Sequence, residues 1–244
     1  MKRIFVDLHL CPNPNEPDCV KRMVTKASQL GYNLIAMSLP PNFVKERGQW
    51  LQGLCSEAGV DFVSRADLKS RTPGELINGL RKLRRKFEII AVACESKNVA
   101  RQASKDRRVD LLNFPALDFR GRFFDRAEAE LASKGLAVFE VDLRPLLTLE
   151  GPPRVRLLST LRREVAIAKA FHVPVVISSG VQDESLMRKP REMAALASLF
   201  DLDEASALKA VSENPAAIVK RNKQKLSAQF VAPGIRVVRR GKDC

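Results

Sequence analysis

Short apolar runs alternate with amphipathic segments along almost the whole chain. The runs are near-continuous and rich in β-branched and aliphatic residues, which is typical of parallel strands covered on both faces. They predict seven strands, at residues 4–8, 33–39, 60–64, 87–93, 110–114, 136–141 and 174–178. The amphipathic segments between them have the length of ordinary helices, so the pattern predicts an α/β fold.

The clearest helix start lies at Thr72. We expect Thr72 at the N-cap, Pro73 at the first helical position and Glu75 closing a capping box. The apolar residues that follow fall on one helical face: Leu76, Ile77, Leu80 and Leu83. The sequence therefore predicts a helix with one buried face, whose polar side carries a run of Arg and Lys.

Seven strands, each followed by a helix, fit a TIM-barrel-like (β/α) barrel, and an open doubly wound sheet is the alternative. The chain contains neither a G-x-G-x-x-G fingerprint nor a G-x-x-x-x-G-K-[ST] phosphate loop. Their absence removes the usual support for a nucleotide site. We expect a single barrel domain at residues 1–219 and a short basic C-terminal extension at residues 220–244.

Charge adds a functional indication to this fold. The formal net charge is +14, and residues 220–244 hold eight Lys and Arg against Asp243 alone, which is half of it. A charge of this size indicates a polyanionic partner, most often nucleic acid, although solubility alone is the simpler explanation. Hydrophobic residues make up 45% of the chain, which excludes a disordered basic protein.

The cysteines indicate the compartment. Five are present at irregular spacing, without any C-x-x-C pair, and the chain opens without a signal-peptide pattern. We therefore expect a reducing, cytoplasmic environment. The longest uncharged stretch, residues 28–44, contains Gly31, Asn33, Pro40 and Pro41. It is too short and too interrupted to cross a bilayer, so we expect no membrane partner.

Basic residues gather in three consecutive β/α units, near residues 81–86, 101–108 and 120–122. One such cluster alone could be a solvated helix face, but three together favour a phosphate-binding patch. Phe123 and Phe124 are the few aromatic residues expected near it, so recognition of folded RNA through phosphates and shape is favoured over base stacking. The candidate RNA-binding residues are Arg65, Lys69, Arg71, Arg81, Arg84, Arg85, Lys97, Arg107, Arg108, Arg120 and Arg122.

Polar side chains at the predicted ends of strands are the candidates for chemistry, because barrel sites form there. They are Asp7, His9, Ser38, Arg65, Glu95, Asn113, Asp142, Ser178 and Ser179. Asp7 and His9 could hold a cation, but a lone D-x-H is as readily structural, and His172 is expected at the opposite end of the barrel. The Ser178-Ser179-Gly180 segment could bind phosphate or simply form a tight turn, and neither Ser has a histidine partner for a hydrolase triad.

Six strings in a fixed order carry a family resemblance. They are FVDLH at residues 5–9, GYNLIA at 31–36, DLLNFP at 110–115, FEVDLRPLL at 139–147, VISSG at 176–180 and ENPAAIV at 213–219. Together they resemble the family of archaeal ribonuclease P protein component 3, homologous to the eukaryotic p30 subunit. The resemblance extends from about residue 2 to residue 222.

The resemblance implies a barrel related to the polymerase-and-histidinol-phosphatase superfamily of metal phosphoesterases. Those enzymes carry H-x-H after the first strand, and here His9 matches the first histidine while Cys11 stands at the second. This departure implies a degenerate metal site, with Asp7 and His9 as its remnants, and no cofactor bound by the protein. The family resemblance also implies that the RNA component of ribonuclease P, with bound Mg²⁺, cleaves the 5′ leader from precursor tRNA. The implied partners are that RNA, protein component 2 and the other subunits, with precursor tRNA contacted indirectly.

Three functions are therefore weighed. The first is a non-catalytic RNA-binding subunit of the ribonuclease P holoenzyme that supports tRNA 5′ maturation. The second is a metal-dependent phosphoesterase or nuclease with Asp7, His9, Glu95 and Asp142 as ligands. The third is a protein-binding scaffold without RNA affinity. Salt-dependent RNA binding would separate the first from the third, and metal binding with phosphodiester hydrolysis would identify the second.

Overall fold

Seven parallel strands form one sheet in the computed structural model, which describes residues 3–115, 121–227, 229–232 and 235–237. In chain order they are β1 (Val6–Leu10), β2 (Leu34–Ser38), β3 (Asp61–Lys69), β4 (Ile89–Ala93), β5 (Leu111–Asn113), β6 (Val138–Asp142) and β7 (Val175–Ser178). Neighbours in the sheet follow that same order. All seven predicted strands are confirmed, and β3 continues five residues past its predicted end.

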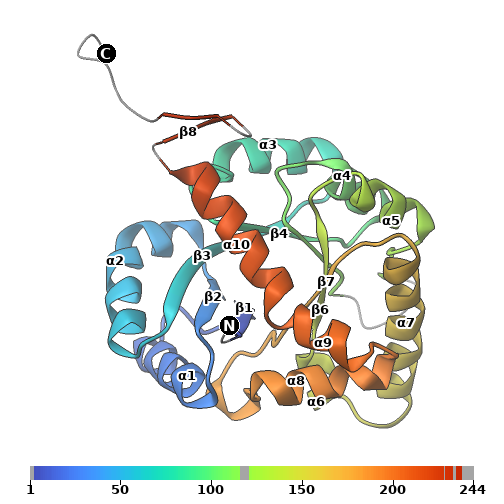
Figure 1. The fold of residues 1–244 in the computed structure, drawn as a ribbon, viewed down its shortest axis with the longest axis horizontal. Helices are drawn as coiled ribbons and strands as arrows, with labels where there is room; N and C mark the ends of the chain where they lie inside the picture. Colours follow the sequence, from blue (N-terminus) through green and yellow to red (C-terminus); the bar gives the residue numbers. More distant parts are fainter. Residues whose placement is uncertain (1–2, 116–120, 228, 233–234, 238–244) are drawn as a thin grey trace.

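The sheet curls until its two edge strands meet. The N–H of Gly180 donates to the carbonyl of His9 at 2.9 Å, and that of Cys11 donates to the carbonyl of Val181 at 2.8 Å. These bonds join the carboxyl ends of β1 and β7, so the molecule is a nearly closed barrel (Figure 1). The predicted TIM-barrel-like fold is confirmed, and the doubly wound alternative is wrong.

Helices surround the barrel and return the chain to the start of each strand (Figure 1). They are α1 (Pro17–Leu30), α2 (Pro41–Glu57), α3 (Pro73–Leu83), α4 (Lys97–Lys105), α5 (Arg126–Ser133), α6 (Arg144–Thr148), α7 (Gly151–Ala170), α8 (Pro190–Leu196), α9 (Glu204–Ala210) and α10 (Glu213–Leu226). The hydroxyl of Thr72 accepts from the N–H of Glu75, as predicted. The expected capping box is not formed, because the Glu75 carboxylate accepts from Arg71 N–H instead.

Helix α10 closes the barrel at the amino ends of the strands. Ile218 and Val219 pack into the barrel interior against inward residues of the strands, such as Val6 and Leu34. The helix lies across the barrel in Figure 1. A larger apolar layer fills the space between the strands and the surrounding helices. This arrangement leaves the opposite end, at the carboxyl ends of the strands, as the open mouth.

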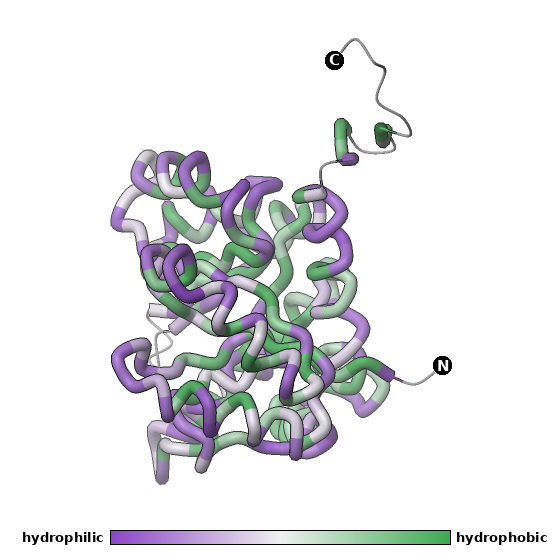
Figure 2. Tube along the Cα trace, turned by 90° about the vertical axis from the view of Figure 1, so that its left-hand side faces the viewer, coloured by the Kyte–Doolittle hydropathy of each residue, from purple (hydrophilic) through white to green (hydrophobic). Residues whose placement is uncertain are grey.

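The boundary expected between residues 219 and 220 falls inside α10. Asn222 is buried and donates to the carbonyl of Glu88 at 2.8 Å. Arg221 donates to the Asp110 carboxylate, also at 2.8 Å. The barrel therefore includes α10 to its end at Leu226. Beyond it, β8 (Phe230–Ala232) and β9 (Ile235–Arg236) form a small antiparallel pair that stands apart from the barrel in Figure 2.

Among the described residues, none of the helices combines the length and the apolar character needed to span a membrane.

Candidate functional site

A bulge in β1 separates the two side chains of the predicted Asp7–His9 pair. Asp7 pairs with Ile35 and Leu10 with Met37, so β1 contains one more residue than β2 between those points. His9 therefore turns into the mouth of the barrel, whereas Asp7 is buried outside it. Burial raises the pKa of Asp7, whose carboxylate accepts from the N–H groups of His9 and Ser179.

The mouth contains a cavity of about 320 Å³ at the carboxyl ends of the strands. Of the polar residues predicted there, the ones that line it are His9, Ser38, Asn113 and Asp142. Glu95 is exposed and does not line it. The cavity also has polar residues that sequence reasoning did not assign to a site, among them Asp67, Glu140 and Arg144.

A buried guanidinium lies beneath the cavity. The Arg65 side chain is fully buried, with its Nη1 and Nη2 donating to the two carboxylate oxygens of Glu140 at 2.6 and 2.8 Å. The same guanidinium donates to Asp67 at 2.7 Å and to the carbonyl of Leu8 at 2.7 Å. Such paired, hydrogen-bonded burial is the condition under which a charge is tolerated in a protein interior.

The network continues across the barrel to neighbouring strands. Ser178 donates to Glu140 at 2.7 Å, and the amide of Asn113 donates to Glu140 at 3.0 Å and to Asp142 at 2.8 Å. Glu140 is the most highly connected of the site residues that the sequence analysis missed. Its signal was a carboxylate in the middle of an otherwise apolar strand, where a buried partner is required.

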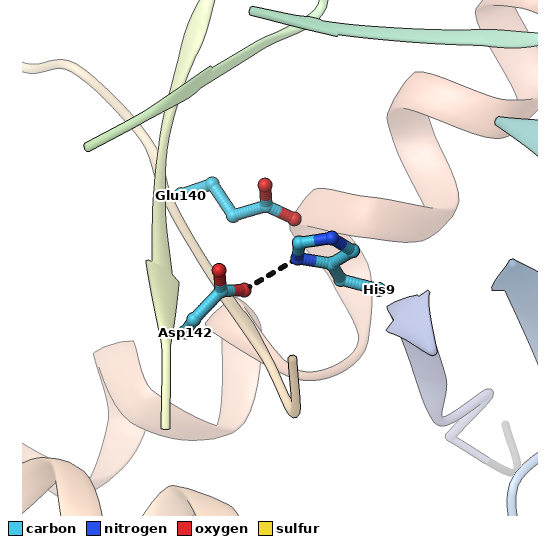
Figure 3. A group of neighbouring side chains, drawn as sticks. All are labelled: His9, Glu140 and Asp142. Atoms are coloured by element: carbon cyan, nitrogen blue, oxygen red, sulfur yellow. Dashed lines mark hydrogen bonds and ion pairs between the residues drawn. The ribbon is translucent and has the colours of Figure 1, made fainter. Parts of the chain in front are cut away.

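His9 is held between two carboxylates. Its Nδ1 lies 2.8 Å from Asp142 Oδ1, as Figure 3 shows, and its Nε2 lies 4.0 Å from Asp67. Burial and the Arg65 charge oppose protonation of the ring, but Asp142 and Asp67 outweigh them and raise the pKa of His9. Burial alone would raise the pKa of Asp67 and of Asp142, whereas the charges of Arg65 and His9 hold both pKa values below the ordinary range.

Three of these residues approach the geometry of a metal site. One ligand atom each from His9, Glu140 and Asp142 lie within 4.8 Å of one another (Figure 3). However, both oxygens of Glu140 are engaged by Arg65, so a cation already neutralises this position. The residues as arranged do not fit a metal ion. The predicted ligand set is also wrong as a group, since only His9 and Asp142 meet while Asp7 and Glu95 lie elsewhere.

The Ser178-Ser179-Gly180 segment forms a tight turn in the structure. Ser179 N–H donates to Asp7 and Gly180 N–H donates to the His9 carbonyl, so both groups are used internally. Gly180 has a positive φ of 66°, and a Cβ there would lie 3.0 Å from the Asp142 side chain. The turn therefore needs glycine, and these two N–H groups are not free to bind a phosphate.

Two of the candidate RNA-binding arginines are buried in the structure. Arg65 is fully buried in the network just described. Arg122 is also buried, and its guanidinium donates to Glu164 at 2.7 Å and to the Phe114 carbonyl at 2.5 Å. Both guanidinium groups are therefore engaged by carboxylates inside the barrel, although Arg122 also lines the cavity at the mouth. Arg120 lies outside the described residues.

The remaining candidates lie at opposite ends of the barrel rather than in one continuous patch. Lys69 is the last residue of β3, and Arg71 and Lys97 follow the carboxyl ends of β3 and β4, so all three lie near the mouth. Lys97 also lies 3.4 Å from Asp125. The other group lies where α3 and α4 end, beside the amino ends of the next strands, and consists of Arg81, Arg84, Arg85, Arg107 and Arg108.

The end of α10 joins this second group. The Asp110 carboxylate accepts from Arg84 at 2.5 Å and from Arg221 at 2.8 Å, which brings α3 and α10 together. Partial burial and the nearby charges of Arg221, Arg84 and Arg107 lower the pKa of Lys225, although Asp110 acts in the opposite direction. Cations therefore outnumber carboxylates at this point. We call the cations at the ends of α3, α4 and α10 the basic surface: Arg81, Lys82, Arg84, Arg85, Lys86, Lys105, Arg107, Arg221, Lys223 and Lys225.

Within the basic surface, exposure and pairing differ from residue to residue. Arg84 and Arg221 are partly buried against Asp110. Arg81, Arg85 and Arg107 are exposed, and none of them forms an ion pair with a carboxylate in the described part of the chain. Sequence reasoning missed the contribution of α10 because it assigned those residues to a separate extension.

Fold and site together define a (β/α) barrel of seven strands with an ion-paired mouth and a basic surface at the other end. The family model of the ribonuclease P subunit p30 matches residues 4–227, and the chain belongs to this family. Ribonuclease P protein component 3 of Methanosarcina barkeri is 31% identical over 97% of this chain and 97% of its own length. That of Methanosarcina mazei is 28% identical over 98% and 97%.

A solved structure agrees in fold. A chain in the cryo-EM structure of archaeal ribonuclease P with mature tRNA superposes with a TM-score of 0.81 and 23% identity. The superposition covers 97% of this chain and 99% of that one. The two chains therefore share their fold over nearly their whole length.

Proposed function

We propose that this chain is a protein subunit of ribonuclease P that binds the RNA component through the basic surface and does not itself cleave the substrate. The enzyme complex removes 5′ leaders from precursor tRNA, and in this proposal the chain supports that reaction. Membership of the p30 family supports the assignment to ribonuclease P. The observation that carries the RNA-binding part is the convergence of cations at one place: Arg84 and Arg221 pair with Asp110, and their charges and that of Arg107 act on Lys225.

The chemistry of the basic surface suits phosphate contacts. Exposed Arg85 and Arg107 present guanidinium groups without carboxylate partners among the described residues, so they can pair with RNA phosphates without breaking internal bonds. The partly buried Arg84 and Arg221 are held by Asp110 and fix the relative positions of α3 and α10. Phosphate contacts of this kind position a folded RNA without reading its sequence.

The mouth supports a role that is not catalytic. The basic surface lies at the amino ends of the strands, whereas the His9, Glu140 and Asp142 group lies at the carboxyl ends. RNA held on the basic surface would therefore not place a phosphodiester at that group. In this proposal the Mg²⁺ used for cleavage is carried by the RNA component, and the chain works in the cytoplasm beside protein component 2.

A metal-dependent phosphoesterase is retained as the second candidate because His9, Glu140 and Asp142 lie within 4.8 Å of one another. If this candidate held, the purified chain would bind Mn²⁺ and hydrolyse a generic phosphodiester, and Asp142→Asn would abolish both. We expect neither activity, since Arg65 occupies the carboxylate that a metal would need.

Reconstituted cleavage of precursor tRNA tests the proposal. The chain alone should leave precursor tRNA intact, and should raise the cleavage rate when added with protein component 2 to the RNA component. The double variant R85E/R107E should require a higher protein concentration for the same rate, because phosphate contacts become repulsive. R163E/R191E is the matched control, with the same change in charge at two exposed arginines of α7 and α8.

Two outcomes would contradict the proposal. Leader cleavage by the protein without the RNA component would place the chemistry in the barrel. Equal losses in R85E/R107E and R163E/R191E would show that net charge, and not the basic surface, governs the effect.

A further inference from the structure

The acidic mouth of the barrel contains its own cation. Asp67, Glu140 and Asp142 bring three carboxylates to one end of the barrel, which is an assembly that normally requires a bound cation. The Arg65 guanidinium lies among them, fully buried, and hydrogen-bonds directly to Asp67 and Glu140. This guanidinium is the feature that the proposed function leaves unexplained.

The contacts of Arg65 extend the network through five of the seven strands. Arg65 and Asp67 belong to β3 and Glu140 belongs to β6, while the Leu8 carbonyl that Arg65 reaches belongs to β1. Glu140 in turn accepts hydrogen bonds from Asn113 on β5 and from Ser178 on β7. A divalent ion coordinated at the mouth would join strands in the same way.

We propose that Arg65 is a resident cation, which occupies the place and performs the structural role of a divalent metal ion at the mouth of this barrel. The guanidinium supplies one positive charge and a rigid fork of donors, so it offsets part of the negative charge of the carboxylates and fixes the distances between strands. Its removal takes the guanidinium charge away from the ligand geometry of His9, Glu140 and Asp142. The chain without Arg65 then becomes a metal-binding protein.

The variant Arg65→Met tests this inference, because it keeps the length of the side chain and removes its charge. In EDTA it should unfold about 10 °C below the wild type, since loss of one partner leaves buried carboxylates uncompensated. Saturating Mn²⁺ should raise its unfolding temperature by at least about 5 °C, and titration followed by electron paramagnetic resonance should show one bound ion. The wild type should show neither effect.

Two further variants separate charge from packing. The double variant R65M/E140Q removes the buried pair together, so it should be more stable than Arg65→Met in EDTA and should not respond to Mn²⁺. Arg65→Lys keeps the charge but loses the two-pronged contact with Glu140. We expect it to be intermediate in stability and insensitive to Mn²⁺.

The inference is overturned by any of three results. The first is an Arg65→Met protein that is as stable as the wild type in EDTA. The second is an Arg65→Met protein that gains no more from Mn²⁺ than R65M/E140Q does, or that cannot be recovered by refolding with Mn²⁺ while R65M/E140Q folds. The third is wild-type chain that binds Mn²⁺ in a manner lost in Asp142→Asn. None of these measurements involves RNA, so they stand apart from the tests of the proposed function.

Discussion

His9 shows how one inserted residue determines what a side chain does. In a regular strand Asp7 and His9 would point to the same side, but the β1 bulge sends His9 into the mouth beside Asp142. There the ring acts as a second positive charge near the carboxylates. The D-x-H motif is thus divided between two environments: one buried carboxyl outside the barrel and one ion-paired imidazole at its mouth.

The raised pKa of His9 predicts a defined dependence of stability on pH. The ordinary pKa is 6.5, and the folded value lies well above it because Asp142 and Asp67 outweigh burial and Arg65. The protonated ring therefore stabilises the fold fully below pH 6.5, and this contribution is lost as the pH rises through the folded pKa. His9→Asn should be less stable than the wild type in mild acid, and the difference should narrow steadily in alkaline solution.

Urea unfolding at a series of pH values measures this difference, and comparison with the wild type cancels the titration of other groups. His172→Asn is the control, since His172 is exposed and its positive φ of 55° is tolerated by asparagine. A constant difference between His9→Asn and the wild type across the range would show that His9 contributes only packing.

Among the elements, α10 has the largest consequence for the limits of the fold. Its apolar residues close the barrel interior, and its polar residues bind Glu88 and Asp110 at the start of β4 and β5. The helix therefore serves both the core and the basic surface. A division of the chain at residue 219 would separate these two roles.

Two truncations test the place of α10 in the fold. A chain ending at Val219 loses the Asn222 and Arg221 bonds, which leaves a buried carbonyl and half of the Asp110 pairing unsatisfied. It should lose at least about 3 kcal/mol of unfolding free energy. A chain ending at Ser227 keeps all these contacts and should remain within about 0.5 kcal/mol of the full chain in urea unfolding. Equal stabilities of the two truncations would refute a structural role for residues 220–227.

The strands and helices could be predicted from the sequence more readily than the contacts between them. The seven strands could be predicted because a strand buried on both faces requires apolar residues throughout. The direction of Arg65 could not, since β3 continues past the end of its apolar run and carries Arg65 beneath the cavity. Arg122 looked like part of a basic loop for a similar reason: its partner, Glu164, is 42 residues away on α7. The sequence alone does not reveal whether a basic side chain is paired with a carboxylate inside the protein or is exposed and free to bind a ligand.

At the scale of the whole molecule, the two ends of the barrel have different electrostatic designs. At the mouth, carboxylates from β3 and β6 are paired with the buried Arg65 and with His9. At the other end, Asp110 is shared by Arg84 and Arg221, and further exposed cations surround it. The net charge of +14 therefore includes internal pairs that cannot contact a ligand. Only the exposed, unpaired part of it is available for RNA.

Salt dependence of RNA binding measures that available part. The logarithm of the RNA-binding constant falls with the logarithm of salt concentration, and each phosphate contact with a duplex makes this slope steeper by about 0.9. The variant R85E/R107E should therefore make the slope shallower by roughly 2. R163E/R191E should leave the slope unchanged. The same comparison should be made in a chain ending at Ser227. This truncation retains the basic surface but removes four basic residues of the terminal segment: Arg236, Arg239, Arg240 and Lys242. If R85E/R107E lowers the slope equally in both backgrounds, the contacts lie on the barrel. If truncation lowers the slope and R85E/R107E does not change it, the phosphate contacts lie in the terminal segment. This follows because only cations in contact with phosphate release counterions.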